Sequence, residues 1–115
     1  MKAVVIVLND LNYLDEVLEA FVRLGVEGAT ILDSYGMGKA LRDSKSLNYL
    51  MKGSIERSIP KETESSKTIF SIVPDNEKAD FLIKTIESIL YRSESKLVGF
   101  LFSLPVSSIN PIIKK

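Results

Sequence analysis

Residues Lys2–Leu8 read KAVVIVL, a run with β-branched or aliphatic side chains at nearly every position. Such a run is typical of a central β-strand. Successive side chains of a strand point to opposite faces of the sheet, so the consecutive apolar residues Val4–Val7 require both faces to be covered. This requirement constrains the fold more than any other feature of the chain.

An amphipathic helix is predicted after this strand. Apolar residues recur there at the spacing of one helical face: Leu14, Val17, Leu18, Phe21 and Val22. Asn12 suits the N-cap of this helix, and Asp15 places a negative charge in its first turn. Gly25 follows where a left-handed C-cap is expected, because glycine has no Cβ to oppose that conformation.

A second amphipathic helix is predicted over Glu77–Tyr91, after the turn and capping residues Pro74-Asp75-Asn76. Its apolar stripe consists of Ala79, Leu82, Ile83, Ile86, Ile89 and Leu90. Short apolar runs predict three more strands: Ala29–Leu32 continuing to Ser34, Thr68–Val73, and Leu97–Leu104. After Pro105 the tail is expected to be an edge strand or coil.

The predicted order is strand, helix, strand, long loop, strand, helix, strand. Two right-handed crossovers separated by a strand–strand connection give an α+β, ferredoxin-like βαββαβ fold, with an antiparallel four-stranded sheet and two helices on one face. We expect residues 1–115 to form a single domain. Two helices cover only one face, so the second sheet face is expected to be covered by self-association.

The segment 37–67 shows no strong period and predicts a long functional loop between the second and third strands. Its seven basic residues outnumber its four acidic ones; the basic residues are Lys39, Arg42, Lys45, Lys52, Arg57, Lys61 and Lys67. A short apolar cluster lies within it: Leu47, Tyr49, Leu50 and Met51. An exposed apolar patch in a loop commonly marks a partner site, so these four are candidate partner-binding residues; the alternative is that the cluster folds back on the self-associated protein.

Composition excludes several function classes. The chain has no cysteine and no histidine, which removes thiolate nucleophiles, imidazole bases and the usual zinc ligands. Its 15 basic residues equal its 15 acidic ones, so no electrostatic footprint for nucleic acid or an anionic membrane is present. The apolar run at the N-terminus is too short for a signal peptide and fits a buried strand, and we expect a cytoplasmic protein.

Several short stretches together resemble the nitrogen-regulatory PII family over nearly the whole chain, with their spacing preserved. The matching stretches are Leu14-Asp15-Glu16-Val17, Gly28-Ala29-Thr30, Gly36-Met37-Gly38, Val73-Pro74-Asp75 and Leu104-Pro105-Val106. The resemblance implies a non-enzymatic signal-transduction protein, assembled as a homotrimer, that regulates a partner protein through a long mobile loop at about 37–67.

In PII proteins ATP or ADP lies in the cleft between neighbouring subunits. The resemblance implies that Val7 and Ile72 flank an adenine and that Thr30 bonds to it. It further implies that Gly28 lets the backbone approach the ligand, and that Gly36, Gly38 and Lys39 handle phosphates. Gly99 is retained from the family's glycine-rich loop. Exposed backbone N–H groups and a lysine suit an anion, so ATP, ADP or AMP is the expected ligand.

The chain also departs from the family pattern. Phe100 stands where the family has a basic residue, Phe70 stands where it has an acidic one, and Ser107-Ser108-Ile109-Asn110 replaces its C-terminal Arg-x-Arg arm. Each lost charge-assisted bond is worth about 1.5–3 kcal/mol. A smaller and less charged effector, an adenosine-type ligand or no ligand therefore fits better than a magnesium–ATP complex.

Two other functions use the same architecture. An ion-binding or ion-tolerance trimer of the copper-tolerance type remains an alternative, although the absence of histidine and cysteine argues against soft metals. An acylphosphatase-like hydrolase needs an anion-binding loop after the first strand. The sequence there is Asn9-Asp10-Leu11-Asn12, whose carboxylate would repel phosphate, so the chain is not expected to be an enzyme.

Overall fold

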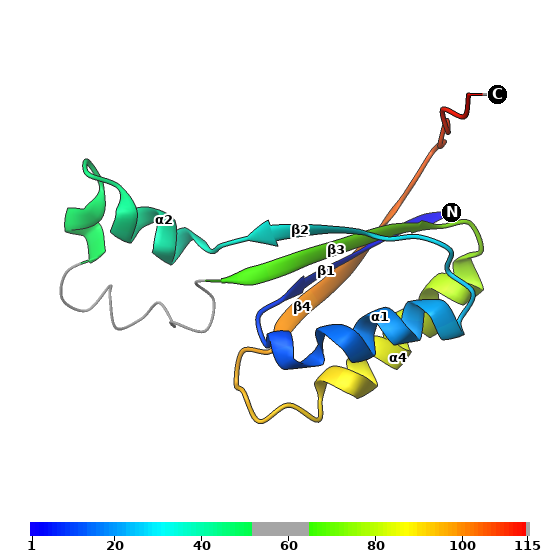
Figure 1. Cartoon of the computed structure of the whole chain (residues 1–115), viewed down its shortest axis with the longest axis horizontal. Helices are drawn as coiled ribbons and strands as arrows, with labels where there is room; N and C mark the ends of the chain where they lie inside the picture. Colours follow the sequence, from blue (N-terminus) through cyan, green and yellow to red (C-terminus); the bar gives the residue numbers. More distant parts are fainter. Residues whose placement is uncertain (52–64, 115) are drawn as a thin grey trace.

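The computed structural model describes residues 1–51 and 65–114 (Figure 1). Along the chain the elements are β1 (Lys2–Leu8), the 3₁₀-helix η1 (Leu11–Tyr13), α1 (Leu14–Arg23), β2 (Thr30–Ser34), α2 (Met37–Asp43), the 3₁₀-helix η2 (Asn48–Met51), β3 (Ser66–Val73), α4 (Asn76–Leu90) and β4 (Gly99–Pro105). The four predicted strands and the two long predicted helices are all confirmed. The last strand begins two residues later than predicted, and residues 106–114 are coil.

The sheet is antiparallel throughout, in the order β2-β3-β1-β4. The pair α1 and α4 lies side by side on one face of it (Figure 1). This is the predicted α+β, ferredoxin-like arrangement, in which each crossover places the next strand in the same sheet with one strand position between.

The core lies between this helical pair and the sheet. The strands contribute alternate residues that are fully buried, including Val4, Ile6 and Leu8 from β1. The helices contribute residues at helical spacing, including Phe21 of α1 and Leu82 of α4. Val22, predicted to lie on the same stripe of α1, is 76% exposed, because the core-facing stripe passes through Val17, Ala20 and Phe21 instead.

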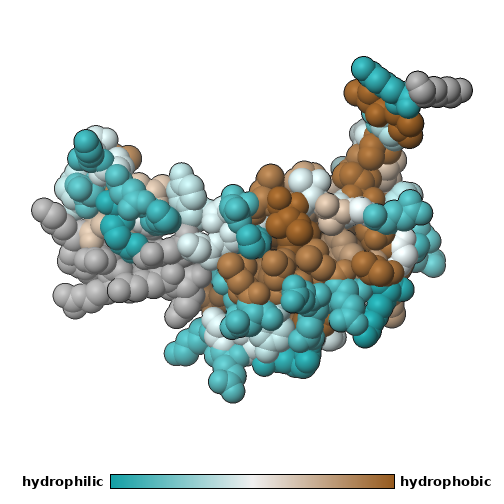
Figure 2. Space-filling model, viewed as in Figure 1, coloured by the Kyte–Doolittle hydropathy of each residue, from teal (hydrophilic) through white to brown (hydrophobic). Residues whose placement is uncertain are grey.

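The other sheet face, here called the open face, has no covering element in the described part of the chain. The register places its residues in three rows across the strands: Leu32, Thr68, Val7 and Phe100; then Thr30, Phe70, Val5 and Phe102; then Ile72, Ala3 and Leu104. Most of these side chains are apolar, and the larger ones on β3 and β4 are exposed. Figure 2 shows hydrophobic side chains gathered over the strands and continuing onto the C-terminal tail.

The ends of α1 follow local rules. Gly25 has φ of +73°, and the amides of Gly25 and Val26 donate to the carbonyls of Val22 and Phe21. These two hydrogen bonds close the helix in the way predicted for a glycine C-cap. The predicted N-cap is wrong: the Asp10 side chain accepts from the Asn12 amide and caps η1, which leads into α1.

Asp75 caps α4 and gives a prediction. Its carboxylate accepts from the amides of Glu77, at 2.9 Å, and Lys78, at 3.5 Å. Replacing Asp75 by Ala should lower the free energy of unfolding by about 1 kcal/mol, since two amides of the first turn lose their acceptor. Urea unfolding measures this. The matched variant Asn12→Ala removes a side chain that caps no helix and should change stability by less than about 0.5 kcal/mol; an equal loss would contradict the assignment.

Part of the prediction for the segment 37–67 is wrong. We expected no regular structure there, yet α2 begins at Met37 and η2 follows it, with α2 packed against η2. The sequence MGKALRD contains several strong helix formers, and Lys39 pairs with Asp43 one turn later at 2.7 Å. A helix of only seven residues is too short to show a period. The predicted loop residues 52–64 lie outside the described residues.

Candidate functional site

A hollow of about 520 Å³ lies at one end of the open face, where β1 ends and β4 begins. We call it the open-face hollow. It is lined by Val7, Asn9, Ser34, Tyr35, Gly36, Ser66, Thr68, Leu97, Gly99 and Phe100. Its volume is in the range of small-molecule sites. Two of its sides are the ends of β2 and β3 that lead into and out of the segment 37–67, so a ligand there would touch the base of that segment.

Gly99 forms the closest backbone approach at this site. Its φ is +152°, and a Cβ built on it would lie 2.3 Å from the Val7 carbonyl oxygen. The amides of Asn9 and Asp10 both donate to the Val98 carbonyl, which fixes the two strand ends against each other. Only glycine fits this position, because any side chain would push β4 away from β1. The structure thus supplies a packing reason for Gly99 that needs no ligand.

Three hydroxyl groups meet on the β2–β3 side of the hollow. The Ser34 hydroxyl lies 2.7 Å from that of Ser66 and 2.9 Å from that of Thr68. Ser34 and Ser66 are the last pair of the β2–β3 ladder, so the register itself brings them together. The cluster gives the hollow hydrogen-bonding capacity without charge.

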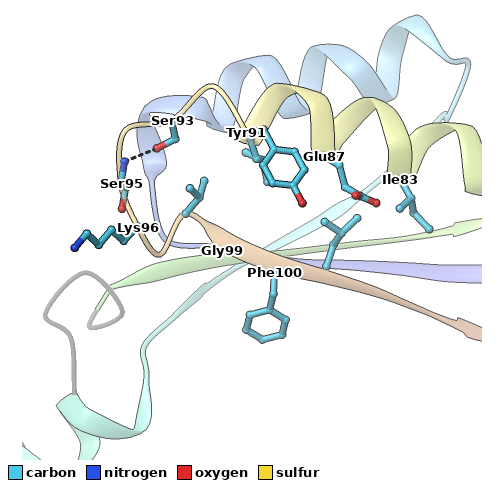
Figure 3. Close-up of a pocket in the computed structure, with 11 residues that line it drawn as sticks. Ile83, Glu87, Tyr91, Ser93, Ser95, Lys96, Gly99 and Phe100 are labelled. Carbon is cyan, nitrogen blue, oxygen red and sulfur yellow. Dashed lines mark hydrogen bonds between the residues drawn. The ribbon is translucent and has the colours of Figure 1, made fainter. Parts of the chain in front are cut away.

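A second hollow, of about 510 Å³, lies on the helical side of β4. Figure 3 shows Ile83 and Glu87 of α4, and Tyr91 directly after the helix, above β4. Phe100 projects from the opposite side of the strand. The connection to β4 is ordered by a bond from the Ser95 amide to the Ser93 hydroxyl at 3.1 Å. This helix-side hollow shares Gly99 and Phe100 with the open-face hollow, and among the predicted ligand residues its described lining contains Gly99 alone.

The predicted ligand residues fall into two groups within one chain. Val7, Gly36 and Gly99 line the open-face hollow. Ile72 and Thr30 lie toward the other end of the sheet: Val7 pairs with Thr68, and Ile72 follows four residues later on β3. Four residues at the rise per residue of a β-strand place Ile72 about 13 Å along β3 from Thr68, the partner of Val7. A single chain therefore does not bring Val7 and Ile72 to the two faces of one adenine ring.

Gly28 and Thr30 belong to the second group. The Gly28 carbonyl accepts from the buried Ser71 hydroxyl at 2.5 Å, which ties the connection before β2 to β3. A Cβ at Gly28 would meet nothing within 4 Å, so this chain alone gives no steric reason for a glycine there. Thr30 is exposed on the open face opposite Phe70.

The remaining predicted phosphate contacts lie on α2 or at its start. Gly36 has φ of −82°, an ordinary extended conformation, and Gly38 is buried within the helix rather than presenting its backbone to a ligand. The Lys39 ammonium bonds to the Asp43 carboxylate and lies 5.5 Å from the centre of the Tyr35 ring. Gly38 and Lys39 do not line the open-face hollow.

The apolar cluster after α2 is only partly exposed. Leu47 and Tyr49 are exposed and Leu50 is half-buried, as a surface patch requires. Met51 is 4% exposed, so the expectation that it belongs to an exposed patch is wrong. It is the last residue of η2, which packs against α2.

Sequence reasoning missed most residues of the open-face hollow. Asn9, Ser34, Tyr35, Ser66 and Leu97 were not singled out. One signal was available: residues that flank a strand–strand connection face each other in an antiparallel ladder, which would have paired Ser34 with Ser66. The contribution of Leu97 depends on the path of the connection before β4 and has no such signal.

Among residues 1–51 and 65–114, no three His, Cys, Asp or Glu side chains gather as a metal ion would require. None of the helices in the same residues is long and apolar enough to cross a membrane.

Comparison with known proteins identifies the family. Curated proteins give no match to the chain. A family model, that of the nitrogen regulatory protein P-II, matches residues 1–114. The match covers nearly the whole chain and agrees with the strand order, the helical pair on one face and the position of the long segment between β2 and β3. The chain therefore belongs to the P-II family of regulatory signalling proteins.

Proposed function

We propose that this protein is a cytoplasmic homotrimeric regulator that binds a small effector, such as ATP, ADP or AMP, in clefts between its subunits. In this proposal the segment 37–67 engages an unidentified partner protein, through Leu47, Tyr49 and Leu50. No enzymatic step is assigned to it. The observation that supports the proposal most strongly is the apolar open face, which the described part of the chain leaves without cover.

The open face supports assembly because of its chemistry. Phe70, Phe102 and Leu104 expose a contiguous apolar surface, where a monomer in water would normally have polar side chains. Burying such area is favourable by about 25 cal/mol per Å². Covering the open face with copies of the same chain satisfies the requirement that the apolar run of β1 imposes.

The separation of the two ligand groups supports a cleft between subunits. Val7 and Gly36 lie at one end of the sheet, and Thr30 and Ile72 lie toward the other. A second copy can bring its own Thr30 and Ile72 to the first copy's Val7, whereas one chain cannot.

Light scattering tests the assembly. At micromolar concentration we expect a mass of three times the 12.8 kDa of one chain. A monomer would contradict the proposal. A thermal-shift series with ATP, ADP and AMP tests the effector separately, since a ligand present at 100 times its Kd stabilises the native state by about 2.7 kcal/mol.

Amide hydrogen exchange tests the link between effector and segment. The open-face hollow touches Ser34, Tyr35 and Ser66, which flank the segment 37–67. Binding there should slow exchange in Met37–Asp43, because ordering the base of the segment limits local opening. Exchange that is identical with and without a bound effector would separate binding from regulation and contradict the proposed mechanism.

Nothing in the described residues favours the ion-binding alternative. Several of the described acidic residues form ion pairs, such as Asp33–Lys67 and Asp80–Lys2, and no three of the described carboxylates gather into a shared site.

A further inference from the structure

The helix-side hollow exists because β4 is an edge strand that α4 covers only in part. Leu101 of β4 pairs with the fully buried Ile6 of β1 and shares its face of the sheet, yet it is only half-buried. Ile83 and Val98 beside it are half-buried as well. A hollow of about 510 Å³ thus has an apolar floor, and this volume is in the range of small-molecule sites.

One stripe of α4, continued by the residue that follows it, forms a wall of the hollow. The stripe consists of Ile83, Glu87, Leu90 and Tyr91, whose spacing places them on one side of a helix. Its outer members are the polar ones: Glu87 is half-buried and Tyr91 is 83% exposed. Figure 3 shows both side chains above β4. A carboxylate and an aromatic ring therefore lie over the apolar floor.

The connection 93–98 closes the other end of the hollow and is held in place by hydrogen bonds. The Ser93 hydroxyl donates to the Asp10 carboxylate at 2.5 Å and accepts from the Ser95 amide at 3.1 Å. The Val98 carbonyl accepts from two amides at the end of β1. The backbone that carries Ser95 and Lys96 is thus fixed beside the hollow before a ligand arrives, which lowers the entropic cost of binding.

Two opposite charges at this hollow have no ion-pair partner in the part of the chain that the structure describes. They are the carboxylate of Glu87 and the ammonium of Lys96. Figure 3 shows them at opposite ends of the hollow, with Tyr91 between them. Each can therefore form a charge-assisted bond with a ligand, and the flexible stem of the lysine lets its ammonium follow the ligand.

This arrangement of charges selects among ligands. A compound with a single charge matches one end of the hollow and leaves the other end unpaired. An α-amino acid has both charges next to one carbon atom, so it cannot reach both ends. A ligand with an ammonium group and a carboxylate group at the two ends of an apolar chain matches both charges and the floor between them.

We propose that the helix-side hollow binds a zwitterion of this kind, an ω-amino acid. Its ammonium group bonds to Glu87, its carboxylate bonds to Lys96 and to the Ser95 hydroxyl, and its apolar chain lies on Leu101 under the Tyr91 ring. The site faces the helical side of β4, whereas the proposed effector cleft lies on the open face. It is a second ligand site and does not depend on the proposed function.

Calorimetric titration with ε-aminocaproate, caproate and hexylamine tests the proposal. The three probes share one carbon chain and differ in their charged ends, and glycine serves as the α-amino acid. We expect the Kd of ε-aminocaproate to be at least about tenfold lower than that of each other compound, the effect of one charge-assisted bond. Equal Kd values for the three chain compounds, equal binding of glycine, or no binding of ε-aminocaproate at millimolar concentration would overturn the proposal.

Variants assign the two ends of the ligand. Glu87→Gln should raise the Kd of ε-aminocaproate and of hexylamine about tenfold and leave that of caproate unchanged. Lys96→Gln should raise the Kd of ε-aminocaproate and of caproate and leave that of hexylamine unchanged. A merely structural role of either residue would weaken all three compounds together, and that result would contradict the assignment.

Glu77→Gln and Lys84→Gln are the matched controls. They remove the same two charges from exposed positions of α4 that do not line the hollow, so they should leave all Kd values unchanged. A rise in Kd equal to that of the hollow variants would show that the net charge of the protein, rather than the hollow, governs binding. Thermal unfolding of the same samples confirms that each variant is folded.

Discussion

Replacing Gly99 by Ala should lower the free energy of unfolding by about 3 kcal/mol, the range in which core disruptions fall. The added methyl would lie 2.3 Å from the Val7 carbonyl oxygen and 3.1 Å from the Leu8 Cα, both of which are backbone atoms of β1. The residue would also have to keep φ at +152°, where a side chain is strained. Relief requires β4 to separate from β1, with loss of ladder bonds.

Gly28→Ala is the matched control for this substitution. The resemblance assigned both glycines to a ligand, but a Cβ at Gly28 meets nothing within 4 Å and φ there is not positive. Its stability should stay within about 0.5 kcal/mol of the original. Urea unfolding of the two variants, compared at constant m-value, measures the difference. Equal losses would mean that the close approach of β4 to β1 does not limit stability.

The second large effect concerns the open face. Phe102→Glu should convert the proposed trimer to a monomer, since every subunit would then bury a carboxylate in an apolar interface. Phe102 lies in the middle row of the face, beside Val5 and stacked on Phe100. It does not itself line the open-face hollow, but it stacks on Phe100, which does, so the mass of the assembly rather than ligand binding is the measurement to use. Light scattering at micromolar concentration would show the loss of mass.

Val22→Glu is the control for this charge. Val22 is 76% exposed on α1, on the face of the protein opposite the open face, so a carboxylate there should leave the assembly unchanged. If both variants remain trimeric, the subunits do not meet through the open face, and the apolar surface of β3 and β4 needs another explanation.

Most of the fold follows from local rules that the sequence displays. The run KAVVIVL predicted a central strand, and the two apolar stripes predicted the helices that cover it. Gly25 closes the end of α1 and Asp75 caps the start of α4, as glycine and aspartate commonly do at helix ends. Tertiary packing decided the exceptions. Val22 fits the helical spacing, but only part of the α1 surface reaches the sheet.

The candidate site was less predictable, because its residues come together through register rather than through spacing. Val7, Gly36 and Gly99 were predicted and do line one hollow. Ser34 and Ser66 are 32 positions apart and meet only because β2 and β3 pair in one particular register. A helix as short as α2 also has too few turns to show a pattern, and it buries Gly38, which was expected to face a ligand.

The two ends of β1 differ in their surroundings, and this has a practical consequence for labelling the protein. The Val106 amide donates to the Met1 carbonyl, and the Met1 ammonium donates to the Asn76 side chain at 2.8 Å. Met1 therefore lies at the opposite end of β1 from Val7 and Gly99. A fluorescent reporter fused before Met1 would be about a strand length away from the open-face hollow. The fusion would remove the exposed hydrogen bond from the Met1 ammonium to Asn76. In the proposed assembly, however, Ile72 at this same end of the sheet contributes to the cleft of a neighbouring subunit, so a bulky reporter before Met1 would obstruct ligand binding there.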